Sequence, residues 1–366
     1  MNSPRTFALG TFAIAGSPPF VGLLIDAAAD PRIIALHALE ELAGRLGLRL
    51  SGGTMLELLD EWERNLDTLA ALVDALAAPA QAAMAARALP VGQLRTLPPL
   101  QPRQILCAGA NYRKHVIDLI LDQPVSVDVS VPKEERRRHA EALMDHRAAR
   151  GKPFIFSKLT SCVVGPQDEV VLPFDMTQPD WELELAVIIG RTARRVPAAR
   201  ALDYVAGFTI GNDLTGREML GRPDMPSMGH DWLAGKCAPT FLTLGPYLVP
   251  SRFVGDPQRL QITLKLNGQV MQDESTADMI FPVSRLIEWA STHVQLQPGD
   301  LLLTGSPSGN GTHYQRFLKP GDLIEGSITG LGAQRNRCVP EQVTAEQAGV
   351  RFQRVEKFQG AKAPQP

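Results

Sequence analysis

The sequence lacks the paired cysteines that build a zinc cluster or a disulfide framework. Its four cysteines, Cys107, Cys162, Cys237 and Cys338, are far apart and form no Cys-x-x-Cys motif. Widely spaced cysteines of this kind argue against a structural metal cluster, and they stay as free thiols in a reducing compartment. We therefore expect a cytoplasmic protein without disulfides.

Aromatic residues, an excess of one charge and long apolar runs are also scarce. Aromatic residues make up 6% of the 366 residues, and the formal net charge of −2 argues against a polyanionic partner such as nucleic acid. No apolar run approaches the length of a membrane span, so we expect no membrane partner. The apolar stretch at 7–15 is short for a signal peptide and leads into a second strand-like run, which favours a β-hairpin. No phosphate-binding glycine loop follows a strand, so nucleotide binding has no support.

The composition that is present fits a globular, loop-rich fold. Hydrophobic residues make up 44% of the chain and charged residues 21%, with 29 prolines and 31 glycines. Residues 6–14 and 20–25 are predicted strands, and 33–46 and 55–78 are predicted helices. We expect a small amino-terminal α/β domain over 1–100, which ends in a Pro-rich connector at 97–102.

The rest of the chain is predicted to be richer in strands. Short apolar runs separated by Gly and Pro follow one another from residue 154 onward, which indicates an α+β, mostly β, domain over 103–340. A charged segment at 122–150 is predicted to be an insertion with a solvated helix, and 341–366 to be a carboxy-terminal tail.

The stretch 181–190 alternates Glu with Leu and then becomes β-branched. In a strand, Glu182 and Glu184 point to the same side, where two adjacent carboxylates need a positive partner. A divalent cation is the economical partner, because hard cations take oxygen ligands. The alternative is a polar face paired with Lys or Arg across the sheet. Asp213, after the predicted strand 205–210, would be a third ligand; alternatively it caps its own turn.

Three further positions have residues suited to proton transfer or anion binding. His115 and Asp118 are three residues apart on one predicted helical turn, as a base and the carboxylate that orients it, or as a surface ion pair. Lys236 lies between small residues and is suited to neutralising a substrate carboxylate or enolate, although most lysines do no such thing. Ser306 lies in a Gly-rich loop that follows a strand, which is either an anion-binding nest or a plain tight turn.

Five segments, taken in order, resemble the fumarylacetoacetate hydrolase family over roughly residues 103–335. They are Asn111-Tyr112-Arg113-Lys114-His115, Trp181-Glu182-Leu183-Glu184, Gly211 to Glu218, Gly235-Lys236, and Pro298 to Gly309. The resemblance implies a mixed β-roll, a homodimer, and a divalent metal, Mg²⁺ or else Mn²⁺ or Ca²⁺, on Glu182, Glu184 and Asp213.

The resemblance also assigns the remaining site residues. It places His115, Asp118 and Lys236 in catalysis, and Tyr112, Arg217 and Ser306 at the substrate. Two positions depart from the family pattern. Asp118 is one methylene shorter than the Glu of many bacterial members, and Leu220 replaces a Gln.

The function implied by this resemblance is hydrolysis of a carbon–carbon bond in an acylpyruvate-type, 1,3-dicarbonyl acid. In that mechanism His115 activates water, and the metal and Lys236 stabilise the enolate that leaves. The alternative is a lyase or isomerase, that is, a decarboxylase, tautomerase or dehydratase, that forms the same enolate from a 2-oxo acid without water attack. A third alternative is a metal-dependent binding protein without turnover.

Overall fold

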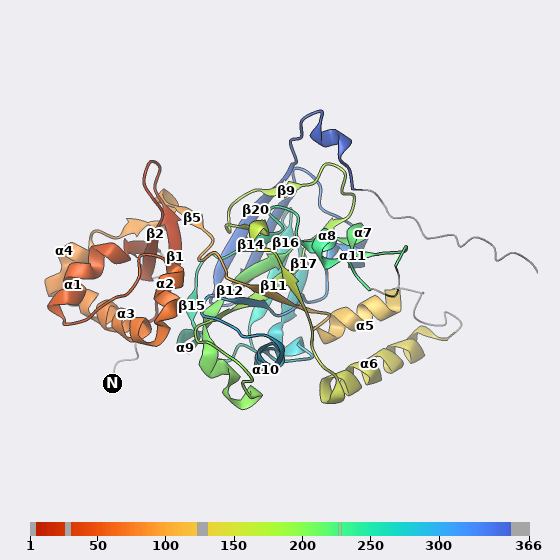
Figure 1. Ribbon diagram of the computed structural model, residues 1–366, viewed down its shortest axis with the longest axis horizontal. Coiled ribbons are helices and arrows are strands. Elements are labelled where there is room, and N and C mark those ends of the chain that lie inside the picture. Colours follow the sequence, from red (N-terminus) through yellow and green to blue (C-terminus); the bar gives the residue numbers. More distant parts are fainter. Residues whose placement is uncertain (1–4, 26–30, 123–130, 226, 228, 353–366) are drawn as a thin grey trace, which may run out of the picture.

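The computed structural model describes residues 5–25, 31–122, 131–225, 227 and 229–352 (Figure 1). In Figure 1 a smaller amino-terminal unit lies beside a larger unit. The larger unit contains an eight-stranded, a five-stranded and a two-stranded sheet. An isolated bridge between Leu9 and Leu248 connects the two units. The sequence placed a boundary between two separate domains near residue 100, and this boundary stays a prediction.

The amino-terminal unit is built on a five-stranded antiparallel sheet with the order β4-β3-β2-β1-β5. Its strands are β1 (Ala8–Ala13), β2 (Phe20–Ile25), β3 (Arg32–Ala35), β4 (Leu89–Pro90) and β5 (Arg95–Leu97). Its helices are α1 (Glu40–Arg45), α2 (Met55–Asp60), α3 (Trp62–Leu76) and α4 (Ala82–Ala85). The interior of this unit is apolar: Leu23 and Leu72 have no exposed surface. Burial of such side chains is the main stabilising contribution to a unit of this size.

The secondary structure predicted from local sequence signals in this unit is partly confirmed. The Thr54 side chain accepts a hydrogen bond from the backbone of Glu57, and the Glu57 carboxylate bonds back to the backbone of Thr54, so α2 begins with a full capping box. The predicted helix at 33–46 is wrong in its first part. Ile33 and Ile34 lie in β3 and pair with β2, because the sheet edge offers hydrogen bonds to this β-branched pair.

The first sheet of the larger unit has eight strands and carries the candidate site. Its order is β7-β6-β18-β11-β12-β14-β8, and β15 pairs with β12. The pairs β6–β18 and β8–β14 are parallel and the others are antiparallel. The strands are β6 (Ile105–Gly109), β7 (Phe154–Lys158), β8 (Val163–Val164), β11 (Leu183–Ile189), β12 (Val205–Asp213), β14 (Leu242–Leu244), β15 (Val249–Pro250) and β18 (Leu301–Leu303).

The second sheet of the larger unit has five strands in the order β17-β16-β19-β20-β9. They are β9 (Val170–Leu172), β16 (Gln261–Leu266), β17 (Gln269–Ser275), β19 (Leu323–Ile328) and β20 (Gly332–Pro340). Asn267 and Gly268 both have positive φ, 52° and 82°, and form the tight turn between β16 and β17. A Cβ atom at Gly326 would lie 2.6 Å from the Leu183 side chain, so this glycine lets the two sheets approach each other next to β11.

Short elements surround the two sheets. The two-stranded pair is β10 (Pro179–Asp180) and β13 (Thr215–Gly216). The helices are α5 (Arg113–Asp122), α6 (Lys133–Arg150), α7 (Arg217–Leu220), α8 (Trp232–Lys236), α9 (Ser251–Val254), α10 (Val283–His293) and α11 (Gly311–Tyr314). Helix α6 contains the charged part of the predicted insertion, whose residues 123–130 lie outside the described residues, as does the end of the tail from 353.

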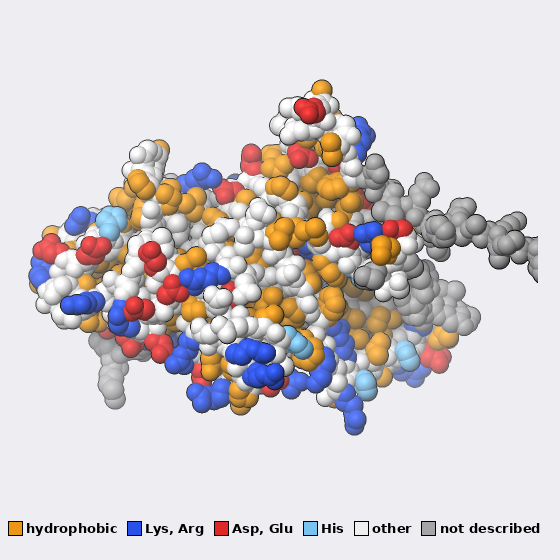
Figure 2. All heavy atoms as spheres, viewed as in Figure 1, with side chains coloured by type: hydrophobic (Ala, Val, Ile, Leu, Met, Phe, Trp, Pro, Cys, Tyr) orange, Lys and Arg blue, Asp and Glu red, His pale blue; other side chains and the backbone are white. Residues whose placement is uncertain are grey.

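The surface shows no large field of one charge on the face that Figure 2 displays, where acidic and basic side chains are interspersed. No single described helix is long and apolar enough to cross a membrane. The bent pair Trp62–Leu76 and Pro79–Ala85 passes that test only when both helices are counted together, and Leu69 and Leu72 of this pair are buried in the amino-terminal core.

Candidate active site

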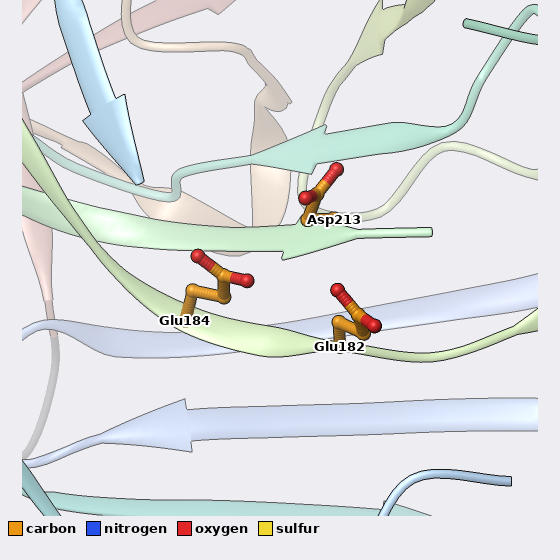
Figure 3. A group of neighbouring side chains, drawn as sticks. All are labelled: Glu182, Glu184 and Asp213. Atoms are coloured by element: carbon orange, nitrogen blue, oxygen red, sulfur yellow. The ribbon is translucent and has the colours of Figure 1, made fainter. Parts of the chain in front are cut away.

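Three carboxylates converge on one face of the eight-stranded sheet (Figure 3). The register of β11 with β12 pairs Leu183 with Asn212, and the Asp213 N–H donates to the Glu182 carbonyl at 2.8 Å. Glu182 and Asp213 are therefore cross-strand neighbours, and residues opposite each other in an antiparallel pair point to the same face. Glu184 is two residues beyond Glu182 and shares that face.

The three carboxylates supply the oxygen ligands that a divalent ion takes, and Glu182 and Asp213 are in addition paired with Lys or Arg, the alternative partner that the sequence left open. One oxygen from each of Glu182, Glu184 and Asp213 lies within 4.8 Å of the others, and all three residues are buried. Glu184 accepts a hydrogen bond from the Gly305 N–H at 2.7 Å, but it forms no ion pair with any described residue. A buried carboxylate without a paired cation is costly, and hard oxygen ligands of this kind suit Mg²⁺, Mn²⁺ or Ca²⁺.

Lys236, at the end of α8, lies in the same cavity and is paired with two of the carboxylates, whereas the sequence suggested that it neutralises a substrate. Its Nζ is 2.7 Å from Glu182 Oε2, 2.7 Å from Asp213 Oδ2 and 3.1 Å from the Asp213 carbonyl. The Phe156 ring lies beside it, with its centroid 5.4 Å from Nζ. Burial opposes the charge on Lys236, but the carboxylates of Asp213 and Glu182 outweigh burial and raise its pKa, so the ammonium stays charged.

Lys158, the last residue of β7, is a site residue that the sequence analysis missed. Its Nζ donates to Asp213 Oδ1 at 2.6 Å and to the Leu214 carbonyl at 3.1 Å, and its side chain has no exposed surface. Lysines are rarely buried without a partner, but the sequence offers no signal that this lysine is buried. Both oxygens of Asp213 are therefore held by ammonium groups.

Arg217 and Asp180 form a second set of charged contacts at the edge of the site. Arg217 Nε donates to Asp180 Oδ2 at 2.8 Å, and its Nη2 donates to Glu182 Oε1 at 2.5 Å. Asp180 also accepts hydrogen bonds from the backbone of Gly311 and Thr312 at the start of α11. Asp180, which is fully buried, was also missed from the sequence.

Burial and neighbouring charges shift the pKa values of the two glutamates in opposite directions. Burial raises the pKa of Glu184 well above its ordinary value, and the charges of Asp213 and Glu182 raise it further. Burial acts on Glu182 in the same direction, but the positive charges of Lys236 and Arg217 outweigh it and lower the pKa to about 2. Glu182 is thus held as an anion by protein cations, whereas Glu184 needs a further positive charge to ionise.

His115 lies in the same cavity as the carboxylates. It is on α5, it is buried, and its imidazole makes no hydrogen bond with any described residue. Burial lowers its pKa to about 4, so the ring is neutral at pH 7. The expected hydrogen bond from His115 to Asp118 is not formed. The Asp118 carboxylate instead accepts a hydrogen bond from Ser308 Oγ at 2.7 Å.

The cavity has a volume of about 600 Å³. The predicted residues that line it are His115, Glu182, Glu184, Asp213, Arg217, Lys236 and Ser306. Ser306 Oγ accepts a hydrogen bond from Gln272 at 2.9 Å. Tyr112, predicted to contact substrate, is fully buried and is not one of the lining residues. The rest of the wall includes Phe156 and Trp232, whose rings stack at 4.2 Å.

Comparison with known proteins supports this fold and places the chain among its relatives. The family model for the fumarylacetoacetate hydrolase C-terminal domain matches residues 104–339. The human mitochondrial oxaloacetate tautomerase FAHD2B is 35% identical over 330 residues, which cover 85% of this chain and 92% of that protein. The mitochondrial oxaloacetate tautomerase FAHD2A of Bos taurus is 37% identical over 291 residues, which cover 78% of this chain and 80% of that protein.

Two solved structures show the same fold. The 2-hydroxyhepta-2,4-diene-1,7-dioate isomerase from Mycobacterium marinum has a TM-score of 0.60 and 26% identity, and the match covers 92% of this chain and all of that one. The maleylpyruvate hydrolase from Sphingobium sp. SYK-6, in complex with manganese(II) ion and pyruvate, has a TM-score of 0.62 and 24% identity with the same coverage. The predicted α+β, mostly β, fold is confirmed by these structures.

The comparisons also decide the predicted location and the predicted family. The cytoplasmic location is contradicted by the human and bovine relatives, which are named as mitochondrial proteins. That prediction depended on free thiols, which indicate a reducing compartment but do not single out the cytoplasm. The family resemblance is confirmed by the matched family model and by these relatives: the chain belongs to the fumarylacetoacetate hydrolase family of enzymes.

Proposed function

We propose that this enzyme interconverts the keto and enol forms of a 2-oxo acid of the oxaloacetate class, with the help of a divalent cation. The observation that carries the proposal is one cavity that brings together three carboxylates, a charged ammonium group and a neutral imidazole without a carboxylate partner. The relatives named as oxaloacetate tautomerases support the choice of reaction. Keto–enol conversion needs only a proton moved between carbon and oxygen, and no attacking water.

Glu182, Glu184 and Asp213 would hold the cation. Mg²⁺ is our first choice and Mn²⁺ or Ca²⁺ the alternatives, because each accepts carboxylate oxygens. When bound, a divalent cation polarises the 2-oxo group of a substrate and lowers the cost of negative charge on its oxygen.

The cations of the chain would bind and orient the substrate. Arg217 lies at the edge of the cavity with a fifth of its side chain exposed, so its guanidinium is placed to meet a substrate carboxylate. Ser306 offers a hydroxyl on the opposite loop. The ammonium group of Lys236 is fixed by two carboxylates, and it would stabilise the negative charge that develops on the 2-oxo oxygen.

His115 would carry the proton. Because its pKa is about 4, the ring is neutral at pH 7 and has one nitrogen free to accept a proton. It would take the proton from the carbon next to the 2-oxo group and return it to the oxygen, so that the substrate and product have the same atoms. In the hydrolytic mechanism Asp118 would orient His115, whereas here its carboxylate accepts a hydrogen bond from Ser308.

A second candidate function is hydrolysis of an acylpyruvate. The cavity volume of about 600 Å³ and the apolar Phe156 and Trp232 wall favour a substrate larger than a four-carbon acid. In this reaction His115 would have to activate water, and Asp118 would have to leave Ser308 to assist it.

The test is an assay of the purified chain with Mg²⁺ and the enol forms of oxaloacetate and of an acylpyruvate. Faster loss of the enol absorbance than in buffer, with no new acid in the product spectrum, supports the tautomerase. Two acid products from the acylpyruvate support the hydrolase, and no acceleration of either substrate contradicts both. Lys236→Met should lose the activity, whereas Lys265→Met, an exposed lysine on β16, serves as the matched control.

We also propose that the enzyme is a homodimer, as the family resemblance implied. Light scattering on the eluate of a size-exclusion column gives the mass directly. A single species of 39.8 kDa, the mass of one chain, would contradict the dimer.

A further inference from the structure

Helix α5 is anchored firmly at its first turn. The Lys114 N–H donates to Asp278 Oδ2 at 2.9 Å, and the Lys114 side chain pairs with Glu274 on β17. Arg113 pairs with Asp145 on α6 at 2.5 Å. These contacts fix the start of the helix to β17 and α6, and Asn111, two residues before α5, donates to the Thr304 carbonyl of the loop that holds Ser306 at 2.8 Å.

A separate hydrogen bond joins α5 to the loop of residues 304–311, which contains Ser306. Asp118, in the second turn of the helix, accepts a hydrogen bond from Ser308 Oγ at 2.7 Å. Ser308 is almost fully buried, and it belongs to the loop of residues 304–311. Among the described side chains, this is the hydrogen bond that joins α5 to that loop. A hydrogen bond of this length to a carboxylate is among the stronger ones in proteins.

His115 lies in the first turn of α5, one turn before Asp118. Residues three apart lie on one face of a helix, so His115 and Asp118 both face the loop and the cavity. The imidazole has no hydrogen bond to a described residue, so its position over the carboxylates depends on the position of α5 itself. A displacement of α5 at Asp118 would carry His115 with it.

We propose that Asp118 and Ser308 form a latch that holds helix α5 against the loop 304–311 and thereby positions the His115 imidazole over the three carboxylates. Both are positioning residues, and neither needs to touch the substrate. The hydroxyl of Ser308 also engages the Asp118 carboxylate, which in the hydrolytic mechanism would orient His115. This last consequence depends on the proposed function.

The latch and a direct charge effect of Asp118 on His115 make opposite predictions about which of two substitutions lowers activity more. In Ser308→Ala the latch is lost but the carboxylate charge remains. In Asp118→Asn the charge is lost, but the amide oxygen still accepts a hydrogen bond from Ser308. The latch therefore predicts that Ser308→Ala is the more harmful change, whereas a histidine-orienting carboxylate predicts that Asp118→Asn is.

The first measurement is hydrogen exchange by mass spectrometry on the full chain, followed in peptides that cover 113–121. Ser308→Ala should speed exchange there by about tenfold, the size expected for losing a hydrogen bond to a charged group. Ser308→Thr restores a hydroxyl and should return exchange toward the wild-type rate, as should Asp118→Asn. Unchanged exchange in Ser308→Ala, with an unchanged melting temperature, would overturn the latch.

The second measurement is steady-state kinetics with the enol substrate. Ser308→Ala should lower kcat by about tenfold with KM changed less than twofold, because the binding groups Arg217 and Lys236 are untouched. A larger loss of kcat in Asp118→Asn than in Ser308→Ala would also overturn the latch. If Ser308→Ala does not fold, Asp118→Ala removes the latch from the other side. Absence of turnover in the wild type would defeat the proposed function alone, since exchange still decides on the latch.

Discussion

The amino-terminal sheet buries almost only apolar side chains, whereas the eight-stranded sheet of the larger unit buries charged side chains as well as apolar ones. In the amino-terminal unit the buried residues are almost all apolar, and the few buried polar residues, such as Asn65, carry no charge. On one face of the eight-stranded sheet, Lys158, Glu182, Glu184 and Asp213 are buried together. Buried charges add little to stability compared with apolar side chains of the same volume. The difference therefore marks which part of the molecule serves folding and which serves chemistry.

The largest expected effect is on turnover, in the charged sheet. Glu184→Gln removes one of the three proposed metal ligands, and it should lower activity by about a thousandfold, roughly 4 kcal/mol of activation free energy. Because the pKa of Glu184 is raised by burial, the variant should be as stable as the wild type or more stable. Mn²⁺ titration calorimetry and the enol assay measure the loss, with the exposed Glu63→Gln as control. Normal Mn²⁺ affinity in Glu184→Gln would refute the ligand set.

Lys158→Met tests how much unfolding free energy is lost when the Asp213 carboxylate, on the same sheet, loses its Lys158 partner. Removing this ammonium group exposes Asp213 Oδ1 to an apolar environment, and we expect a loss of about 4 kcal/mol in unfolding free energy. Urea denaturation measures it, with the exposed Lys265→Met as the matched change. A loss below about 1 kcal/mol would mean that the pair contributes no more than a surface ion pair does.

Leu72→Ala tests how much apolar burial contributes to the stability of the amino-terminal unit. Leu72 has no exposed surface in α3, and its truncation should destabilise the amino-terminal unit by about 3 kcal/mol while activity per folded molecule is unchanged. Leu143→Ala, whose side chain is nearly half exposed on α6, should change stability very little. A fall in turnover of folded Leu72→Ala would show that the two units are not separate in function.

The pH dependence of stability should be smaller in a variant without His115. The folded imidazole has a pKa of about 4 and the unfolded one about 6.5, so the unfolded state binds the extra proton between these values. Stability should therefore fall as the pH is lowered from 6.5 to 4, by on the order of 3 kcal/mol at most. His115→Asn should remove that part of the fall, and the exposed His37→Asn should not. Denaturation at pH 7, 5.5 and 4 measures both.

The smallest expected effect is on the cap of α2. Thr54→Ala removes the side-chain oxygen that accepts the Glu57 N–H, and it should cost about 1 kcal/mol, whereas Thr54→Ser keeps the oxygen. The same urea titration resolves the two variants. Equal stability of Thr54→Ala and the wild type would show that solvent replaces this cap at no cost.

Part of the site could be read from the sequence because its signals are local. Alternation along a strand places Glu182 and Glu184 on one face, whatever the rest of the fold does. The Asn267-Gly268 turn and the Thr54 capping box likewise depend on a few adjacent residues. Asp213, His115 and Lys236 were candidates by residue type, the family resemblance assigned their roles, and the cavity brings them together.

Only the tertiary structure decided which groups meet across long stretches of chain. Lys158 reaches Asp213 from 55 positions away, and Asp118 bonds to Ser308 from 190 positions away instead of to His115 on its own helix. Ile33 and Ile34 join a strand where their local sequence suggested a helix, since the free edge of β2 was available. The sequence by itself determined which residues can ionise and which face of a strand they share. Strand register and helix packing determined their partners, because the distance between two side chains depends on how the whole chain folds and not on their separation along it.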